Sequence, residues 1–426
     1  MIRVSKAALL LMLTLAVPAA AQDDRIDELE RKVDVLTQEI EGLRLGVAAD
    51  TSASLSRYGF APAASKVYGV TRGVTIGGYG ELLLEKFDRE REDDAPSNRI
   101  PQLDYLRNIL YVGFKFDDRL LFNSEIELEH AVVGEGQGGE ITLEFAYLDY
   151  LWRPAFGLRA GMLLVPIGLV NEWHEPPVFI GTRRPDVEQR IIPTTWRANG
   201  AGIFGQLPSG FAYRAYLTEG LDATGFTAGS ALRDGRQSGS RSKLTHPAVS
   251  GRLDYEGLAG LLIGVSGYRG DSWQDAQPAD TLLSPRTTLF DVHARVQYLG
   301  LEARALAVFG QLEDAADLSD HLGLAGQSRL GGRFHGHYVE AAYDVAPLLR
   351  PGASWALLPY ARFERYDTQE DVSGGPENPA NERTTITAGL GVKPHPNVIL
   401  KLDRQSRRNV AETETSQWNV QLGYLY

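Results

Sequence analysis

From Val74 onward, apolar and polar residues alternate with a period of two, which is the repeat of a β-strand. In residues 289–298, one face holds Phe290, Val292, Ala294, Val296 and Tyr298, and the other holds Asp291, His293, Arg295 and Gln297. A soluble barrel with a packed core would bury such charges at a prohibitive free-energy cost. A wide transmembrane barrel avoids that cost, because its lumen is aqueous and its outer face meets lipid. The alternation therefore predicts an all-β transmembrane barrel whose inward charges are solvated.

Sixteen antiparallel strands are predicted, and a count of fourteen or eighteen is the alternative. Short turns and long polar loops alternate between the strands, so the short turns and both chain ends lie at one end of the barrel. Bacterial outer-membrane barrels have this arrangement, with short turns in the periplasm. The predicted strands cover residues 74–86, 103–116, 120–130, 141–152, 156–166, 199–207, 211–219, 248–256, 260–269, 287–299, 301–312, 330–345, 354–367, 383–393, 398–407 and 418–426.

The last segment, 418–426, is predicted to close the barrel by pairing with 74–86. Its apolar face holds Trp418, Val420, Leu422, Tyr424 and Tyr426, and its polar face holds Asn419, Gln421 and Gly423. An edge strand of a soluble sheet shows the same alternation, so the charges in the other strands decide between the two readings. Tyr426 resembles the terminal aromatic residue that outer-membrane barrels present to their assembly machinery, which we therefore expect as a partner.

The overall composition excludes several classes of protein. No apolar run beyond the N-terminus approaches the roughly 20 residues of a membrane-spanning helix. The absence of cysteine excludes disulfides, thiolate metal sites and cysteine catalysis. A net charge of -12 argues against a nucleic-acid partner. His335 and His337 share a strand face, but no carboxylate cluster or cysteine accompanies them, so we predict no metal and no cofactor.

Residues 1–21 are predicted to be a signal peptide. Arg3 and Lys6 precede an apolar stretch over 7–17, and Ala19 to Ala21 provide a small-residue cleavage site. The alternative is an uncleaved membrane anchor, for which the apolar stretch is too short.

Residues 22–44 are predicted to form a periplasmic coiled-coil helix, and residues 45–68, rich in Ala, Ser and Gly, a flexible linker to the barrel domain, 69–426. The number of chains in the coil is left open by two conflicting features. Arg25, before an a residue, and Glu30, after the next d residue, resemble a pattern that specifies trimers, whereas β-branched residues at a with Leu at d favour dimers. The alternative is a single amphipathic helix packed on the barrel. The seam consists of Ile26, Leu29, Val33, Leu36, Ile40 and Leu43.

The third long loop, residues 167–198, is predicted to fold into the barrel. It holds four prolines, and Trp173, Phe179 and Ile191 are residues that an exposed flexible loop rarely carries. Packed against the inner wall, it would constrict the pore. The alternative is a lid over the outer mouth.

The sequence resembles the phosphate-selective porin O/P family. The resemblance is strongest over about 140–206 and is compatible with the whole barrel. It implies sixteen strands, a homotrimer in outer-membrane lipid, and diffusion of small anions such as phosphate through each protomer; the coiled coil departs from the family. The segments that carry it are Glu144–Tyr150, Leu158–Gly168, Asn171–Pro177 and Arg190–Arg197.

The candidate site residues are the charges expected in the pore. The loop contributes equal numbers of both signs: Glu172, Glu175, Asp186 and Glu188 against Arg183, Arg184, Arg190 and Arg197. The basic wall is predicted to hold Arg159, Arg214, Arg252, Arg295, Arg304, Arg362 and Lys401, and the acidic wall Glu125, Glu127, Glu129 and Glu144. Opposed walls predict a transverse field with weak anion preference. The alternative is that same-face neighbours such as Arg252 and Asp254 pair and leave little field.

Three functions follow from these observations. A passive trimeric porin is the first. A structural tether, with the coiled coil joining the outer membrane to another envelope layer, is the second. An outer-membrane hydrolase is the third, and the sequence shows no nucleophile motif that would support it.

Overall fold

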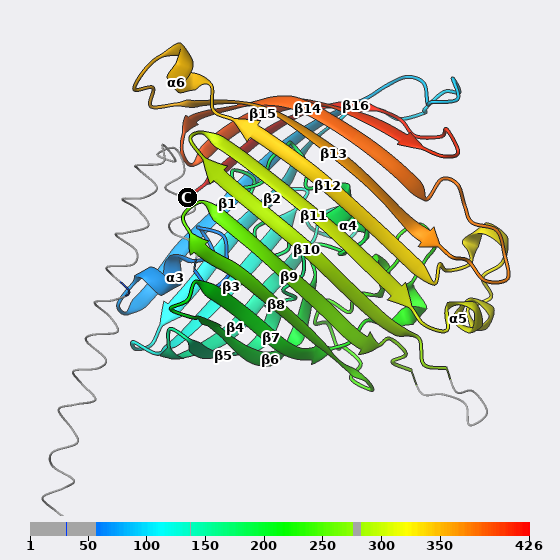
Figure 1. Ribbon diagram of the computed structural model, residues 1–426, viewed down its shortest axis with the longest axis horizontal. Helices are drawn as coiled ribbons and strands as arrows, with labels where there is room; N and C mark the ends of the chain where they lie inside the picture. Colours follow the sequence, from blue (N-terminus) through cyan, green and yellow to red (C-terminus); the bar gives the residue numbers. More distant parts are fainter. Residues whose placement is uncertain (1–30, 32–56, 137, 276–282) are drawn as a thin grey trace, which may run out of the picture.

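The computed structural model describes residue 31 and residues 57–426 except 137 and 276–282. The predicted signal peptide and the six seam residues of the predicted coiled coil lie outside the described residues. The rest of the chain forms a closed antiparallel barrel, in which each strand pairs with its neighbours in the sequence (Figure 1). β1 and β16 close it, with Tyr79 opposite Leu425 and Phe87 opposite Gln417. The prediction of a sixteen-stranded barrel closed by the C-terminal segment is confirmed.

The strand bounds follow the alternation of the sequence closely. The strands are β1 (Gly73–Phe87), β2 (Gln102–Lys115), β3 (Leu120–Glu129), β4 (Ile141–Arg153), β5 (Phe156–Leu164), β6 (Arg197–Gln206), β7 (Phe211–Glu219), β8 (Pro247–Leu258), β9 (Leu261–Asp271), β10 (Arg286–Tyr298), β11 (Leu301–Leu312), β12 (Arg333–Tyr343), β13 (Ala356–Glu370), β14 (Glu382–His395), β15 (Val398–Asn409) and β16 (Gln417–Leu425).

The two faces of each strand meet different surroundings. In β10, Phe290 and Val292 are 48% and 41% exposed on the outer face, whereas Asp291 and His293 on the inner face are 0% and 3% exposed. In β16, Trp418 points outward while Asn419 and Gln421 are buried inside. The outer surface is therefore an apolar belt suited to lipid, and the polar groups face the lumen.

The two ends of the barrel differ in their connections. Short turns lie at the end that holds the C-terminus, α3 and α6, and the longer loops lie at the opposite end with α5 (Figure 1). The turn between β10 and β11 consists of Leu299 and Gly300, both with positive φ, the geometry that suits a two-residue hairpin. The short helices are α3 (Lys66–Gly69), α4 (Asp186–Arg190), α5 (Ala315–His321) and α6 (Ala346–Leu349), with 3-10 turns at Ala223–Gly225, Arg233–Gly235 and Gly326–Ser328. No helix of the described residues is long and apolar enough to cross a membrane.

Residues 57–69, which we call the lumen segment, pack inside the barrel at the short-turn end. Phe60 and Val67 lie in one apolar cluster with inner-wall residues that include Ile109 and Phe145. A flexible linker is predicted over 45–68, but residues 57–68, the part that the structure describes, are packed against the wall. The reason is that Ala61, Ala63 and Ala64 are small enough for the backbone to approach the wall closely.

Candidate functional site: a narrowed lumen with two cavities

The loop between β5 and β6, which we call L3 (residues 165–196), fills the middle of the barrel. All of its residues are buried except Trp173, Arg183, Gln189 and Arg190, which are partly exposed. Asn171 closes its neck: the side-chain amide donates to the carbonyls of Val165 and Trp196 and accepts from the Trp196 N–H at 2.6 Å. L3 thus lies inside the barrel and not over its mouth.

Cationic side chains of the barrel wall hold L3 by its carbonyl oxygens. The Lys401 ammonium donates to the carbonyls of Pro176, Phe179 and Gly181 at 2.8, 2.8 and 2.6 Å. Arg362 donates to the carbonyl of Arg183 at 3.0 Å. Further along the same wall, Arg252 donates to the carbonyl of Gly168 and Arg304 to that of Val178. Charge-assisted hydrogen bonds of this kind are stronger than neutral ones, so they fix the path of L3.

Wall and loop carboxylates complete the attachment of L3. Asp403 accepts from the backbone N–H of Thr182 at 2.8 Å and from the Thr182 hydroxyl at 3.0 Å. Glu188 accepts from the Val170 N–H at 2.6 Å and from the Tyr338 hydroxyl at 2.5 Å. Glu172 lies 3.2 Å from Arg214. Two of the predicted pore-loop carboxylates, Glu188 and Glu172, therefore bind other groups of the protein.

L3 also holds the lumen segment. Glu175 accepts from the N–H groups of Ala63 and Ala64 at 3.0 and 3.1 Å, and the Trp173 indole donates to the carbonyl of Gly59 at 2.8 Å. These bonds satisfy buried donors that would otherwise lack partners. L3 and the lumen segment therefore pack as one body.

The lumen segment is joined to the barrel wall by a second set of contacts. The Tyr68 hydroxyl donates to Asp149 at 2.7 Å, and Arg159 donates to Asp149 through two nitrogens, each at 2.8 Å. The Arg159 guanidinium also lies 4.6 Å from the centre of the Phe60 ring, a cation–π contact. Arg159 is therefore a packing residue and not a solvated pore charge.

The prediction that the basic wall is solvated is wrong for six of its seven residues. Arg159, Arg214, Arg252, Arg304, Arg362 and Lys401 are all buried. Pairs of same-face neighbours, as in the alternative, are present: Arg252 lies 2.7 Å from Asp254 and Arg362 lies 3.0 Å from Glu364, while Arg304 bonds Glu302. These side chains are buried because L3 and the lumen segment lie against this wall.

Three of the four predicted acidic residues, Glu127, Glu129 and Glu144, line a cavity, although Glu127 and Glu144 are themselves buried. A polar cavity of about 330 Å³ lies between β1–β4, L3 and the loop between β7 and β8. Five glutamates and six arginines line it. They are Glu81, Glu127, Glu129, Glu140 and Glu144, and Arg107, Arg183, Arg184, Arg197, Arg233 and Arg236. Both signs of charge therefore line this cavity. Three of the glutamates belong to the predicted acidic wall, whereas the arginines lie on β2, β6, L3 and the loop between β7 and β8, and none of them belongs to the predicted basic wall.

Three of the six arginines are paired with carboxylates. Arg107 lies 3.2 Å from Glu81 and 3.4 Å from Glu127, and Arg197 lies 2.6 Å from Glu144. Arg183 pairs with Glu85 on β1. These pairs reduce the field at the acidic side of the cavity.

The other three arginines bind only uncharged acceptors among the described residues. Arg184 donates to the Thr195 hydroxyl at 3.0 Å, Arg233 to the carbonyl of Thr194 at 2.6 Å and Arg236 to the carbonyl of Pro193 at 2.9 Å. Burial, and then the neighbouring Arg236 guanidinium, lower the pKa of Arg233 to about 9, so it keeps its charge at neutral pH. These arginines leave positive charge at the cavity.

Several residues that line the polar cavity are not among the predicted site residues. Glu81 and Arg107 lie on strands whose alternation alone would have placed them on the inner face. Arg233 and Arg236 lie in the long loop between β7 and β8, and its inward path depends on the bonds that both residues make to L3. No local pattern in that loop signals this path.

The remaining predicted site residues take other positions. Glu125 is buried and lies 3.1 Å from His174 of L3, and Asp186 lies 3.3 Å from Arg407 on β15. The Arg295 guanidinium lies 4.0 Å from the centre of the Trp173 ring. Arg190 is partly exposed at the end of α4. These residues mostly position L3.

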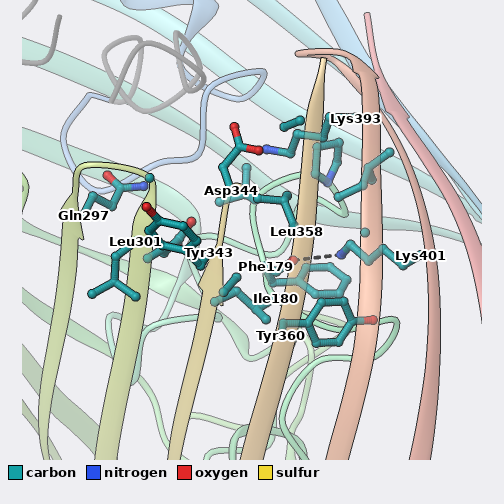
Figure 2. Close-up of a pocket in the computed structure, with 18 of the residues that line it drawn as sticks. Phe179, Ile180, Gln297, Leu301, Tyr343, Asp344, Leu358, Tyr360, Lys393 and Lys401 are labelled. Carbon is teal, nitrogen blue, oxygen red and sulfur yellow. Dashed lines mark hydrogen bonds between the residues drawn. The ribbon is translucent and has the colours of Figure 1, made fainter. Parts of the chain in front are cut away.

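A second cavity, of about 310 Å³, lies between L3 and the short-turn ends of β10–β15. Its lining is mainly apolar and includes Phe179, Ile180 and Leu358, with Lys393 and Lys401 at its edge (Figure 2). Phe179 lines both cavities. The L3 stretch around Phe179 therefore separates a polar space from an apolar one.

His335 and His337, which share a strand face, contact side chains of the neighbouring strand β13. His335 lies 3.1 Å from Glu370, and the His337 ring lies 6.1 Å from that of Phe363. Within the described part of the chain there is no group of three or more His, Cys, Asp or Glu residues placed to hold a metal ion.

Comparison with solved structures shows that the fold is that of outer-membrane porins. An anion-selective porin from Comamonas acidovorans is 14% identical with a TM-score of 0.51, covering 83% of this chain and 98% of that chain. The outer-membrane channel DcaP of Acinetobacter baumannii is 12% identical with a TM-score of 0.50, covering 84% and 98%. OmpF of Salmonella typhi is 14% identical with a TM-score of 0.52, covering 83% and 98%.

Sequence comparison gives a nearer relative. No family model matches the chain, so its place in the phosphate-selective porin O/P family remains a prediction. An uncharacterized protein of Aquifex aeolicus (strain VF5) is 39% identical over 355 residues, which cover 81% of this chain and 78% of the relative. The chain therefore belongs to the same protein family as this Aquifex aeolicus protein.

Proposed function

We propose that the chain is an outer-membrane channel for passive diffusion of small hydrophilic solutes, without enzymatic activity. The observation that carries the proposal is the polar cavity lined by opposed carboxylates and arginines inside a closed barrel with an apolar outer belt. Hydrophilic solutes need such a lining to cross a bilayer, and L3 would set the size of those that pass. We expect lipid around the belt and no nucleic-acid partner.

The arrangement of the arginines supports a weak preference for small anions, with phosphate one candidate. Arg184, Arg233 and Arg236 carry positive charge without a carboxylate partner among the described residues, whereas Arg107 and Arg197 are paired. Five glutamates in the same lining limit the preference. Strong cation selectivity in planar-bilayer reversal potentials would contradict this proposal.

Replacing Arg233 and Arg236 together by glutamine tests the role of these charges. We expect the reversal potential in a KCl gradient to move toward cation selectivity, because the five glutamates then outnumber the four remaining arginines of the lining. The double lysine variant should keep the wild-type value, which separates charge from positioning. Arg241→Gln is the matched control, since Arg241 is exposed on the same loop. An unchanged potential in the double glutamine variant would show that the pair does not set selectivity.

For the N-terminal region we propose a cleaved signal peptide over 1–21 and a periplasmic coiled coil over 22–44 that clamps a homotrimer. The lumen segment, which follows these residues, packs with α3 at the short-turn end of the barrel (Figure 1), and this supports a periplasmic position for the coil. At the other terminus, we propose that the assembly machinery recognises the strand that ends in Tyr426.

Deleting residues 22–56 separates a trimer clamp from a tether. If the coil is a clamp, the trimer band on native gels should dissociate at lower temperature while the envelope stays intact. Loosening of the outer membrane with an unchanged trimer would favour the tether. The deletion spares the lumen segment, so neither outcome is due to the loss of that segment.

A further inference from the structure

The apolar cavity beneath L3 has the features of a ligand site. Its volume of about 310 Å³ lies at the lower end of the range for small-molecule pockets, which are mostly apolar with a few placed polar groups. At about 30 Å³ for each water molecule, it would hold about ten waters, or one solute of similar size. Val178, Ile180, Leu358 and Ile399 supply apolar surface from L3 and two strands.

Most charged groups of this cavity are already satisfied. Lys401 donates to three carbonyls of L3. Glu302 is bonded to Arg304, and one carboxylate oxygen of Asp344 accepts from the N–H groups of Ala346 and Leu357, each at 3.0 Å. None of these groups has to find a partner in an incoming solute.

Lys393 differs from its neighbours. It lies on the inner face of β14 opposite Ala356, two residues from Gly391, and it is partly exposed at the cavity edge (Figure 2). Lys393 forms no ion pair among the described residues, although the carboxylates of Glu302 and Asp344 belong to the same cavity lining. An ammonium beside an apolar cavity complements a ligand that joins an apolar body to an anionic group.

We propose that this cavity binds an amphipathic carboxylate from the periplasmic side, with its alkyl or aromatic body against Ile180 and Leu358 and its carboxylate against Lys393. This is a site separate from the polar cavity, and its occupancy does not depend on conduction. Because Phe179 lines both spaces, a bound ligand would also lie directly beneath the diffusion path.

The test is calorimetric titration of 4-phenylbutanoate into the full-length barrel in lipid nanodiscs, with empty nanodiscs as the blank for partition into lipid. We expect saturable binding with one ligand per chain. 4-Phenylbutanol, which has the same body without the charge, should bind about tenfold more weakly, and acetate should not bind detectably. Equal binding of the acid and the alcohol would overturn the role of Lys393, and binding seen equally in empty nanodiscs would overturn the site.

Two variants separate the ammonium from the apolar cavity. Lys393→Gln should weaken 4-phenylbutanoate to the level of the alcohol and leave the alcohol unchanged; Lys86→Gln, at an exposed position on β1, is the matched control. Gly391→Leu should abolish binding of both compounds by filling the cavity. Gly391→Ala should retain binding, because a Cβ there meets Leu358 and Ile399 at 3.5 and 3.6 Å, an ordinary contact distance.

Conductance in KCl, recorded on the same preparations, separates this proposal from the proposed function. A channel that conducts without binding 4-phenylbutanoate would overturn the ligand site alone. A barrel that binds it without conducting would overturn the channel function and leave the site standing. If Gly391→Leu binds as tightly as the wild type, the ligand lies elsewhere and the proposal is wrong.

Discussion

Deleting residues 22–69 is expected to raise the single-channel conductance severalfold, whereas deleting residues 22–56 should leave it unchanged. The difference between the two deletions is the lumen segment, which packs between L3 and the inner wall of β1–β5. Its removal leaves Tyr79 and Tyr111 bordering space that water can fill, and a wider aqueous path conducts more ions. Planar-bilayer recordings of the two purified proteins measure the effect.

A point variant provides a milder version of the same test. A Cβ at Gly59 would meet the Arg214 guanidinium at 2.6 Å, and Gly59 has a φ of +91°, which a side chain disfavours. Arg214 cannot easily move, because it bonds Asp254 at 2.7 Å. Gly59→Val should therefore loosen the lumen segment and raise conductance partially. If both the long deletion and Gly59→Val fold but conduct like the wild type, the segment does not obstruct the channel.

The barrel could be predicted from the sequence because strand burial is a local property. Each residue of an alternating strand faces either lipid or lumen, so Phe290 and Asp291 reveal their sides without any knowledge of their neighbours. Closure could be predicted for the same reason, since β16 has the same two-faced pattern as the strands it joins. The strand bounds differ by only a few residues where loops begin.

What fills the lumen could be predicted only in part. The apolar residues of L3 indicated that it packs inward. The cations that bind it were interpreted as pore charges, because the alternation places Lys401 on the inner face whether its ammonium meets water or carbonyl oxygens. The lumen segment has an alanine-rich composition that also suits a linker. Its packing depends on Glu175 and Asn123, which lie far away in the sequence. Contacts of this range leave no periodicity to detect.

Replacing Lys401 by methionine is expected to release L3 from the wall. Methionine keeps much of the apolar stem but removes all three hydrogen bonds to the carbonyls of Pro176, Phe179 and Gly181. Leaving a buried carbonyl without a partner costs about 1–3 kcal/mol, so L3 gains by moving to where water can reach those groups. We expect frequent transitions between current levels in single-channel recordings. Trypsin should also cleave after Arg183, and mass spectrometry of the fragments would locate the cut.

The effect of Lys401→Met on L3 has to be distinguished from an effect on the barrel. The interstrand hydrogen bonds of β14–β16 do not include L3, so the barrel of Lys401→Met should keep its wild-type heat-modifiable migration on gels. Lys86→Met, at an exposed position on β1, should remain uncleaved and quiet. An intact barrel with an uncleaved, quiet L3 would mean that Asp403, Arg362 and Arg304 hold the loop without Lys401. A barrel that unfolds would mean that Lys401 supports the wall itself, because a loop anchor alone has no effect on strand pairing.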